Sequence, residues 1–195
     1  MATTVSGTGL TEAIRSTAVL AAERRLAAQL RSDLGGRAHV YSDRVLAGTS
    51  RTIDHVVIAT SGVWIIDAKD YAGLVEMRNV GGPVHRDLRL YVGGVDRTKL
   101  IGAMQWQHDA VVDALEPTGL EATPVHRALC FINSDSALRA KPFQLDGVWV
   151  IGAQKLTDLI LEPGSVDAAD IDTIAAAVAT KLPAVERSNE RRNRG

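Results

Sequence analysis

Two aspartates and a lysine stand at the ends of an otherwise apolar stretch, "IDHVVIATSGVWIIDAKDY", which runs from Ile53 to Tyr71. Asp54 precedes the first apolar run, and Asp67 and Lys69 follow the second. Two carboxylates that converge repel each other, so their approach is costly unless a positive charge lies between them. Mg²⁺ (or Mn²⁺) supplies such a charge, because it prefers oxygen ligands and leaves coordination positions for water and phosphate. With Lys69 holding the attacking water and stabilising charge at phosphorus, the pattern predicts phosphodiester hydrolysis.

Whether these side chains converge depends on the turn between the two apolar runs. Side chains alternate along a strand, so Asp67 and Lys69 share one face. A two-residue turn at residues 61–62 would place Asp54 opposite Lys69 and diagonal to Asp67, on that same face. In this arrangement the backbone carbonyl of Ala68 could add a metal ligand. A three-residue loop would instead place Asp54 opposite Ala68 and separate the carboxylates.

The elements that must position this hairpin follow from hydrophobic periodicity. An amphipathic helix comes first, followed by a run of strands, a second helix, two buried strands and two closing helices. The first five strands read as an antiparallel meander. The expected ranges are a helix over 11–34, strands over 38–46, 53–60, 63–69, 74–78 and 88–92, a helix over 98–115, strands over 126–133 and 147–152, and helices over 153–161 and 168–182.

Length and composition limit the remaining choices. The chain has 195 residues and a formal net charge of −1, which suits one domain over residues 10–185 without a general attraction to nucleic acid. Residues 1–9 and the basic tail 186–195 are expected to be flexible. A single cysteine, Cys130, excludes an internal disulfide and favours a reducing compartment, so we expect a cytoplasmic protein. No apolar run is long enough to cross a bilayer, so no membrane partner is expected.

The residues around the hairpin resemble a known family. The stretch "RTIDHVVIATSGVWIIDAKDYAGLVE" is similar to the core signature of the NERD family, the nuclease-related domain, whose members resemble the PD-(D/E)xK nuclease superfamily. The likeness extends from "AAERRLAAQL" to "DGVWVIGAQKLTDLI" and covers most of residues 15–160. It implies an α/β fold with a restriction-endonuclease-like core, in which helices flank a central mixed β-sheet in the order αβββαβ. It also implies metal-dependent processing of DNA.

The resemblance also implies roles for individual residues. Asp54 matches the aspartate of the first family motif, and Asp67 and Lys69 match the acidic residue and the lysine of the second. Glu23 matches a glutamate on the first helix, which could approach the metal directly or through water. Gln107 matches a glutamine that orients the substrate or the site. These five residues form the expected catalytic set, with Asp54, Asp67, Glu23 and the carbonyl of Ala68 as metal ligands.

The sequence departs from the family pattern at two positions. Ala22 stands where many members have a glycine before the first-helix glutamate. Asp67 stands where glutamate is frequent, and its shorter side chain still binds oxygen-preferring metals. Gln105 is a second, less favoured match to the glutamine that the family carries on the helix after the sheet. None of these differences removes a chemical function.

Other interpretations remain open at this point. Asp67 and Lys69 could form an ordinary ion pair at a strand end. Glu23 could be a surface residue that pairs with a nearby arginine. The whole chain could be a non-catalytic module that binds nucleic acid or protein, since a fold alone does not establish chemistry. The alanine-rich first helix could also serve as the interface of a homodimer.

Overall fold

The helix predicted over residues 11–34 is α1 (Gly7–Leu34), which begins four residues earlier than expected. It ends as predicted, because Gly35 takes a left-handed conformation with φ 56° that other residues rarely adopt. This computed structural model describes residues 7–132 and 141–185, without the side chains of residues 7–16 and 18. The predicted tail 186–195 and most of the predicted flexible start therefore lie outside the described residues. The boundary of the domain at residue 10 stays a prediction.

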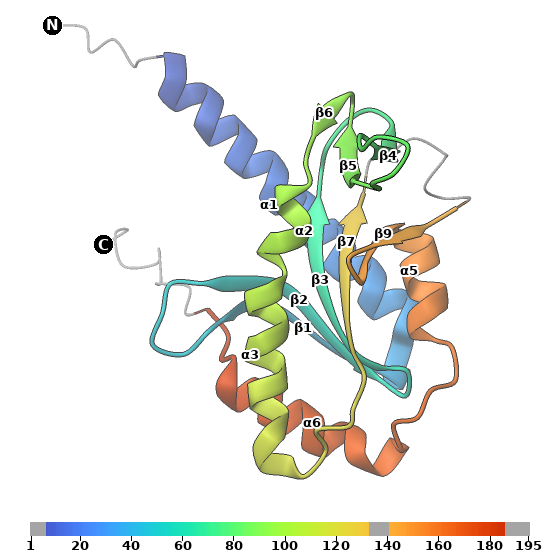
Figure 1. Cartoon of the computed structure of the whole chain (residues 1–195). Helices are drawn as coiled ribbons and strands as arrows, with labels where there is room; N and C mark the ends of the chain where they lie inside the picture. The colour runs from blue at the N-terminus through green and yellow to red at the C-terminus, as the bar shows by residue number, and fades with distance from the viewer. Residues whose placement is uncertain (1–6, 133–140, 186–195) are drawn as a thin grey trace, which may run out of the picture.

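The predicted elements after α1 appear in the predicted order, together with two short strands at residues 95–96 and 143–145 that were not predicted (Figure 1). The predicted second helix is divided at Met104 into α2 and α3. The remaining bounds are η1 (Gly35–Arg37), β1 (His39–Val45), β2 (Thr52–Ala59), β3 (Gly62–Lys69), β4 (Val75–Asn79), β5 (Leu88–Val92), β6 (Val95–Asp96), α2 (Lys99–Ala103), α3 (Gln105–Leu115), η2 (Glu116–Thr118), β7 (Val125–Phe131), β8 (Phe143–Leu145), β9 (Val148–Gly152), α5 (Ala153–Ile160) and α6 (Ala168–Lys181).

Six of the strands form one mixed sheet in the order β1-β2-β3-β7-β9-β8. The β1, β2 and β3 strands are antiparallel, and β7 and β9 then run parallel to β3. The connection from β3 to β7 passes through α2 and α3, as a crossover between parallel strands requires. The predicted α/β class is confirmed, and this helix-flanked mixed sheet is compatible with a restriction-endonuclease-like core.

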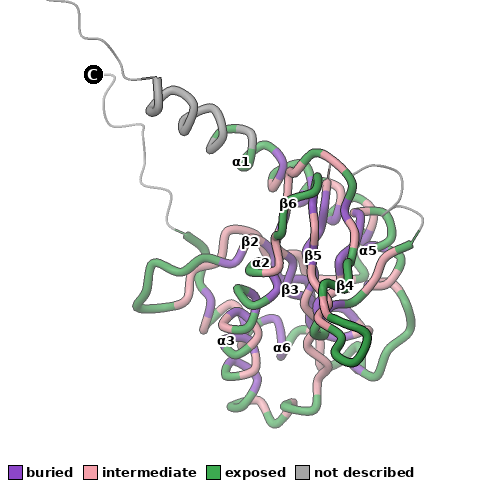
Figure 2. The backbone as a smooth tube through the Cα atoms, turned by 45° about the horizontal axis from the view of Figure 1, so that its top comes forward, coloured by how far each residue is buried: buried purple, intermediate pink, exposed green. Residues whose placement is uncertain are grey.

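Helices cover both faces of this sheet, and each face has its own hydrophobic cluster (Figures 1 and 2). The α3 and α6 helices pack on one face, and α1 and α5 pack on the other. Neighbouring residues of one strand contribute to different clusters, as Val56 and Val57 of β2 do. Because both faces are buried, the central strands are almost continuously apolar, and their polar residues are confined to the strand ends.

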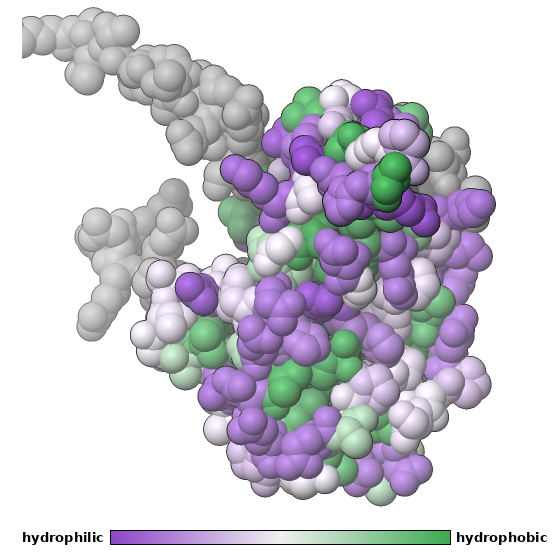
Figure 3. Space-filling view, viewed as in Figure 1, coloured by the Kyte–Doolittle hydropathy of each residue, from purple (hydrophilic) through white to green (hydrophobic). Residues whose placement is uncertain are grey.

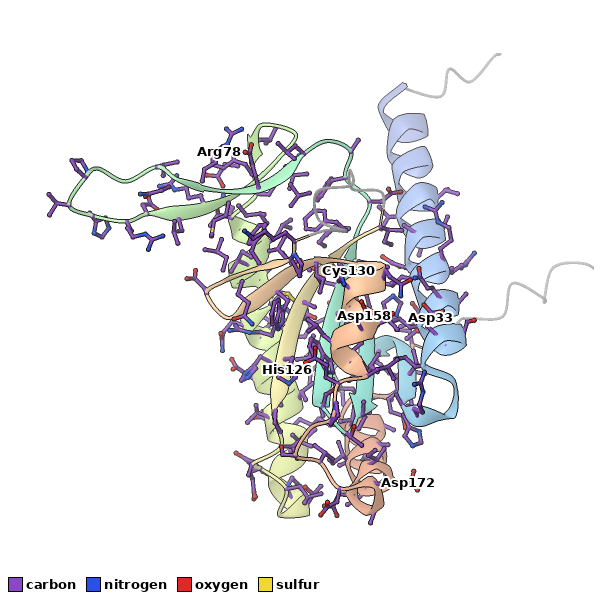
Figure 4. All side chains as sticks on the ribbon, turned by 90° about the vertical axis from the view of Figure 1, so that its right-hand side faces the viewer. Asp33, Arg78, His126, Cys130, Asp158 and Asp172 are labelled. Atoms are coloured by element: carbon purple, nitrogen blue, oxygen red, sulfur yellow. The ribbon has the colours of Figure 1, made fainter. Side chains whose placement is uncertain are left out.

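The β4, β5 and β6 strands do not continue the main sheet, so the expectation of a single meander was wrong. They form a separate three-stranded sheet in the order β4-β5-β6. Both edges of β3 are already paired, one with β2 and the other with β7, which leaves no edge for β4. We call residues 75–96 the arm, since this ribbon projects sideways from the body in Figure 4.

The helices were also compared with the length and polarity that a bilayer requires. Within residues 7–132 and 141–185, none of them combines the length and the apolar character needed for a transmembrane span.

Candidate functional site

The turn between β2 and β3 lies at residues 60–61, so the predicted turn at residues 61–62 was wrong by one position. Ala59 pairs with Gly62, the first residue of β3. Gly62 is needed inside the strand because a neighbouring segment passes very close. A Cβ atom on Gly62 would lie 2.4 Å from the carbonyl oxygen of Pro124, and the φ of Gly62 is 124°. The glycine therefore permits a close approach of two backbones instead of forming the turn.

The observed turn still has two residues. The partner of each β2 residue on β3 therefore differs from the predicted partner by an even number of positions, and each side chain keeps its predicted face. His55 pairs with Ile66 in the hairpin ladder. The next position in this register sets Asp54 opposite Asp67, whereas the sequence predicted Asp54 opposite Lys69. The change brings the two carboxylates closer together than expected.

Asp54 is held at the end of the hairpin by a backbone contact. Its Oδ2 accepts a hydrogen bond from the backbone N–H of Ala68 at 3.0 Å. The carbonyl of Lys69 accepts from the N–H of Ile132, on the β7 side of the strand. Backbone groups of consecutive strand residues point to opposite sides, so the carbonyl of Ala68 points toward the β2 side, where the Asp54 carboxylate lies. The use of the Ala68 carbonyl as a metal ligand stays a prediction.

The other two residues of the predicted trio form an ion pair. Lys69 Nζ lies 2.6 Å from Asp67 Oδ1, and their side chains are 19% and 13% exposed. One residue further along, Asp70 Oδ2 lies 3.8 Å from Nη2 of Arg25 on α1. The polar end of β3 is therefore partly shielded from solvent and connected to the first helix.

Burial and crowding of charge change the acidity of Asp54. Its pKa is raised, first because burial penalises the ionised carboxylate and then because of the charge of Asp67 and a side-chain hydrogen bond with it. The charge of Glu23 adds to this effect, and the hydrogen bond from the Ala68 N–H opposes it. In the absence of a cation, this group of carboxylates therefore favours a bound proton, and a cation would relieve the same repulsion.

Glu23 reaches the site from α1, which packs on the opposite face of the sheet from α3. It is half-buried and lines a cavity of about 670 Å³ together with Asp54. Its pKa is raised by burial first, then by the charges of Asp43 and Asp67, while Lys69 and Arg24 act in the opposite direction. The helix thus brings Glu23 within electrostatic range of the hairpin residues, as the family resemblance implied.

Asp43 is a further carboxylate of this site that the sequence reasoning missed. The β1 ladder pairs Ser42 with His55 and Arg44 with Ile53, and it skips the position between them, which holds Asp43 on β1 and Asp54 on β2. Asp43 has φ 52°, which aspartate tolerates better than most residues, and it lines the same cavity as Glu23. The available signal was a lone aspartate inside a β-rich stretch, "HVYSDRV", where a regular strand rarely has one.

His55 is buried on the face of β2 opposite to that of Asp54. Its side chain is 1% exposed, and Nδ1 lies 3.1 Å from the hydroxyl oxygen of Ser42. Burial lowers the pKa of His55 to about 4, so the ring is neutral near pH 7. This neutral, buried imidazole links β2 with β1 through its contact with Ser42.

Gln107 is the predicted site residue that the structure does not connect to the others. It is 6% exposed on α3, and its Oε1 has no hydrogen-bond partner within the described residues. None of the hydrogen bonds described for the chain joins it to Asp54 or Asp67. Gln105, the alternative, instead accepts from Nη1 of Arg127 at 2.8 Å and donates to Asp109. The role of Gln107 stays a prediction.

The side chains and the carbonyl at this site suit some metals better than others. Within residues 7–132 and 141–185, no three His, Cys, Asp or Glu side chains are grouped closely enough to hold a metal by themselves. Zinc sites in proteins use three or four such ligands, and calcium takes six to eight oxygens. Mg²⁺ needs only one or two carboxylates and keeps several waters. Asp54, Asp67 and the Ala68 carbonyl therefore fit Mg²⁺ better than these alternatives.

A known protein family matches the part of the chain that carries most of these residues. The nuclease-related domain family (NERD) matches residues 18–132, which include Glu23, the hairpin, the arm and α3. Neither a curated protein nor a solved structure matches the chain. Since the family match covers more than half of the sequence, the chain belongs to the nuclease-related domain family.

Proposed function

We propose that this protein is a metal-dependent nuclease that hydrolyses phosphodiester bonds of DNA, with Mg²⁺ (or Mn²⁺) as cofactor. The observation that carries the proposal is the convergence of Asp54, Asp67 and Lys69 at the open end of the β2–β3 hairpin. Membership of the nuclease-related domain family supports the same chemistry. If Asp67 and Lys69 formed only an ordinary ion pair at a strand end, a second carboxylate, that of Asp54, would not need to be buried beside them.

In this proposal Asp54 and Asp67 hold the metal, the carbonyl of Ala68 completes the protein ligands, and Glu23 contributes directly or through water. The bound cation would neutralise the carboxylates and stabilise negative charge on the phosphate. Lys69 is held beside Asp67 at 2.6 Å, where its ammonium orients the attacking water and stabilises charge developing at phosphorus. The shielded end of β3 strengthens these charge interactions by limiting the access of solvent.

The test is cleavage of linear, nicked and single-stranded DNA with Mg²⁺ or Mn²⁺. Asp67→Asn and Lys69→Ala should each lower the cleavage rate by roughly two orders of magnitude or more. Lys155→Ala is the control, since this lysine forms an ion pair with Asp158 at 3.2 Å on the exposed surface of α5. Cleavage that is unchanged in both site variants would exclude this assignment of residues.

A second candidate function is a nuclease-like module that binds nucleic acid or protein without turnover. The observation that favours it is the absence of a three-ligand metal group among the described side chains. Titration calorimetry of Mg²⁺ and Mn²⁺ distinguishes the two functions, with Asp54→Asn as the control for binding at the site. Protein that binds neither metal yet retains DNA or a protein partner would favour the module.

A further inference from the structure

Glu23 lies where α1 begins to pack on the body, and few apolar contacts hold the helix there. The N-terminal part of α1 extends away from the body (Figure 1). Val19 and Leu20 are each 45% exposed, and Ala22 is the first buried residue among the described side chains of the helix. Figure 3 shows hydrophobic and hydrophilic surface side by side where α1 meets the body. The first packed turn, which contains Glu23, is therefore the part of the helix that opens most easily.

Polar contacts connect α1 to two strands of the sheet. Arg31 Nη2 on α1 donates to Ser42 Oγ on β1 at 3.1 Å. Ser42 Oγ in turn lies 3.1 Å from Nδ1 of His55 on β2. A guanidinium can only donate, so the Ser42 hydroxyl accepts from Arg31 and donates its own proton to His55. This order makes Nδ1 the acceptor and places the ring proton on Nε2. We call Arg31, Ser42 and His55 the polar bridge.

The polar bridge returns to α1 at Glu23. Burial lowers the pKa of His55, and a hydrogen bond with the backbone of Glu23 is among the influences that raise it. A ring N–H donates, so the backbone group is the carbonyl, and it faces Nε2 because Nδ1 faces Ser42. Nε2 is buried and has no partner with full hydrogen-bond geometry among the described residues, so this contact is weaker than an ordinary hydrogen bond. The bridge therefore holds Glu23 through its own backbone.

The bridge also surrounds the cavity of the candidate site. The cavity of about 670 Å³ that Asp54 lines is also lined by Glu23, Arg31, Ser42 and His55. His55 directly follows Asp54 in β2, so the bridge fixes the distance from α1 to the strand residue beside this carboxylate. The ion pair of Arg25 with Asp70 is longer, at 3.8 Å, and its arginine is 59% exposed, so it constrains the helix less.

The rest of α1 does not need the bridge in order to pack. Leu26, Leu30 and Leu34 are buried in the hydrophobic cluster on this face of the sheet. Apolar contacts of this kind hold the helix on the sheet without direction, whereas hydrogen bonds fix both distance and orientation. The bridge is thus suited to setting the position of one residue on the helix.

We propose that the polar bridge positions Glu23 for the proposed metal, by holding α1 at the distance from β2 at which the Glu23 carboxylate contributes a ligand directly or through water. Its three residues are positioning residues that need not touch the metal or the DNA. Groups that orient metal ligands affect metal affinity nearly as strongly as the ligands do. This inference rests on the proposed function, since it assigns the bridge a task at that metal site.

Amide hydrogen exchange of the metal-free protein in EDTA tests the position of the helix. Ser42→Ala removes the hydroxyl that joins the bridge, so the amides of residues 20–27 should exchange roughly tenfold faster. Ser61→Ala is the matched control, because Ser61 also accepts one hydrogen bond, from Trp64, and donates another, to Ile160, at the other end of the hairpin. Both variants should melt about 2–4 °C below the wild type, and only Ser42→Ala should change the exchange of residues 20–27.

Titration calorimetry with Mn²⁺ tests whether the bridge acts through Glu23. Ser42→Ala should weaken Mn²⁺ binding roughly tenfold, and Ser61→Ala should bind as the wild type does. In a Glu23→Gln background, Ser42→Ala should cost less than about twofold, because the side chain that the bridge positions no longer binds the metal as a carboxylate. Ser42→Thr keeps the hydroxyl and should restore the affinity to within about twofold of the wild type.

Two results would overturn the proposal. The first is wild-type exchange of residues 20–27 in Ser42→Ala. The second is a change in Mn²⁺ affinity on Ser42→Ala, including no change, that is equal with Glu23 and with Glu23→Gln. The proposed function fails separately. A wild type that binds no Mn²⁺ and cleaves no DNA would refute the nuclease and the metal task of the bridge, while the exchange measurement would still decide whether the bridge holds α1. A wild type that binds Mn²⁺ and cleaves DNA, with Ser42→Ala unchanged in exchange and affinity, would refute the bridge alone.

Discussion

At the scale of residues, the site is a group of carboxylates whose mutual repulsion is incompletely balanced. Asp54 lies opposite Asp67, Asp43 lines the same cavity as Asp54, and Glu23 approaches from α1. Lys69 balances Asp67 through its ion pair. Burial, together with the excess negative charge, raises the pKa of Asp54, so the proposed metal would have to displace the proton that this group holds.

This competition predicts how stability depends on pH. Below the ordinary pKa of a carboxyl group, both the folded and the unfolded chain hold the Asp54 proton. As pH rises, the unfolded chain loses that proton first, so the folded state loses stability until pH passes the raised pKa. From about pH 5 to about pH 8, the melting temperature of the wild type should therefore fall by several degrees relative to that of Asp54→Asn. For a protein of this size, each kcal/mol of lost folding free energy lowers the melting temperature by about 2–4 °C.

The same thermal melts with Mg²⁺ provide the control. The cation should raise the melting temperature of the wild type more at the higher pH, where it no longer displaces a proton, and it should have little effect on Asp54→Asn. Parallel pH profiles for the two proteins without metal would contradict the raised pKa.

Substitutions of Asp43 can separate the effect of its backbone conformation on stability from the effect of its charge. Its φ of 52° favours Asp or Asn over other non-glycine residues. Asp43→Asn should keep the free energy of unfolding within about 0.5 kcal/mol, whereas Asp43→Ala should lower it by about 1 kcal/mol. Urea denaturation of both variants measures the difference. Equal stability of the two variants would show that the backbone at this position is not constrained.

At the scale of elements, the site depends on how closely β3 and β7 approach at the start of β3. The N–H of Val63 donates to the carbonyl of Pro124 at 2.8 Å, directly beside Gly62. This contact fixes the start of the parallel pairing that continues from Val63 to Lys69. The position of the polar strand end is therefore determined in part by a glycine at the other end of the strand.

Gly62→Ala should consequently destabilise the protein by about 2 kcal/mol or more, because a Cβ 2.4 Å from a carbonyl oxygen requires the backbone to move. Gly48→Ala is the matched control. Gly48 also has a positive φ, 77°, but a Cβ there would meet nothing within 4 Å, so the cost should be only about 1 kcal/mol. Denaturant midpoints of the two variants provide the comparison, and equal midpoints would argue against the close approach.

At the scale of the whole molecule, one sheet separates two hydrophobic clusters. Leu30 of α1 belongs to one cluster and Ile174 of α6 to the other, and both are fully buried. Each central strand contributes alternate side chains to both clusters, so neither can open without exposing the other. The two halves of the site, Glu23 on α1 and the hairpin residues, should therefore be lost together on unfolding.

Leu30→Ala and Ile174→Ala should each lower the free energy of unfolding by roughly 2–5 kcal/mol. Both variants should still unfold in one transition, with the same midpoint by tryptophan fluorescence and by far-ultraviolet circular dichroism. Separate transitions in either variant would show that the two faces of the sheet unfold independently.

Much of the fold could be predicted from the sequence because its signals are local. Alternation and apolar runs located the strands of the hairpin, and Gly35 marked the end of the first helix. The face shared by Asp54, Asp67 and Lys69 was also predictable, because it depends only on an even turn length. The turn itself was misplaced, since the reason for Gly62 is the carbonyl of Pro124, far away in the sequence.

The sequence by itself therefore determined which residues could share a face and which chemistry their types allow. Only the tertiary structure decided that Asp54 faces Asp67, that Asp43 joins them, and that the β4–β5 ribbon leaves the sheet as an arm. The physical reason is that strand pairing is non-local. Once β7 occupies the free edge of β3, the position of every neighbouring strand follows from contacts that no local pattern of residues encodes.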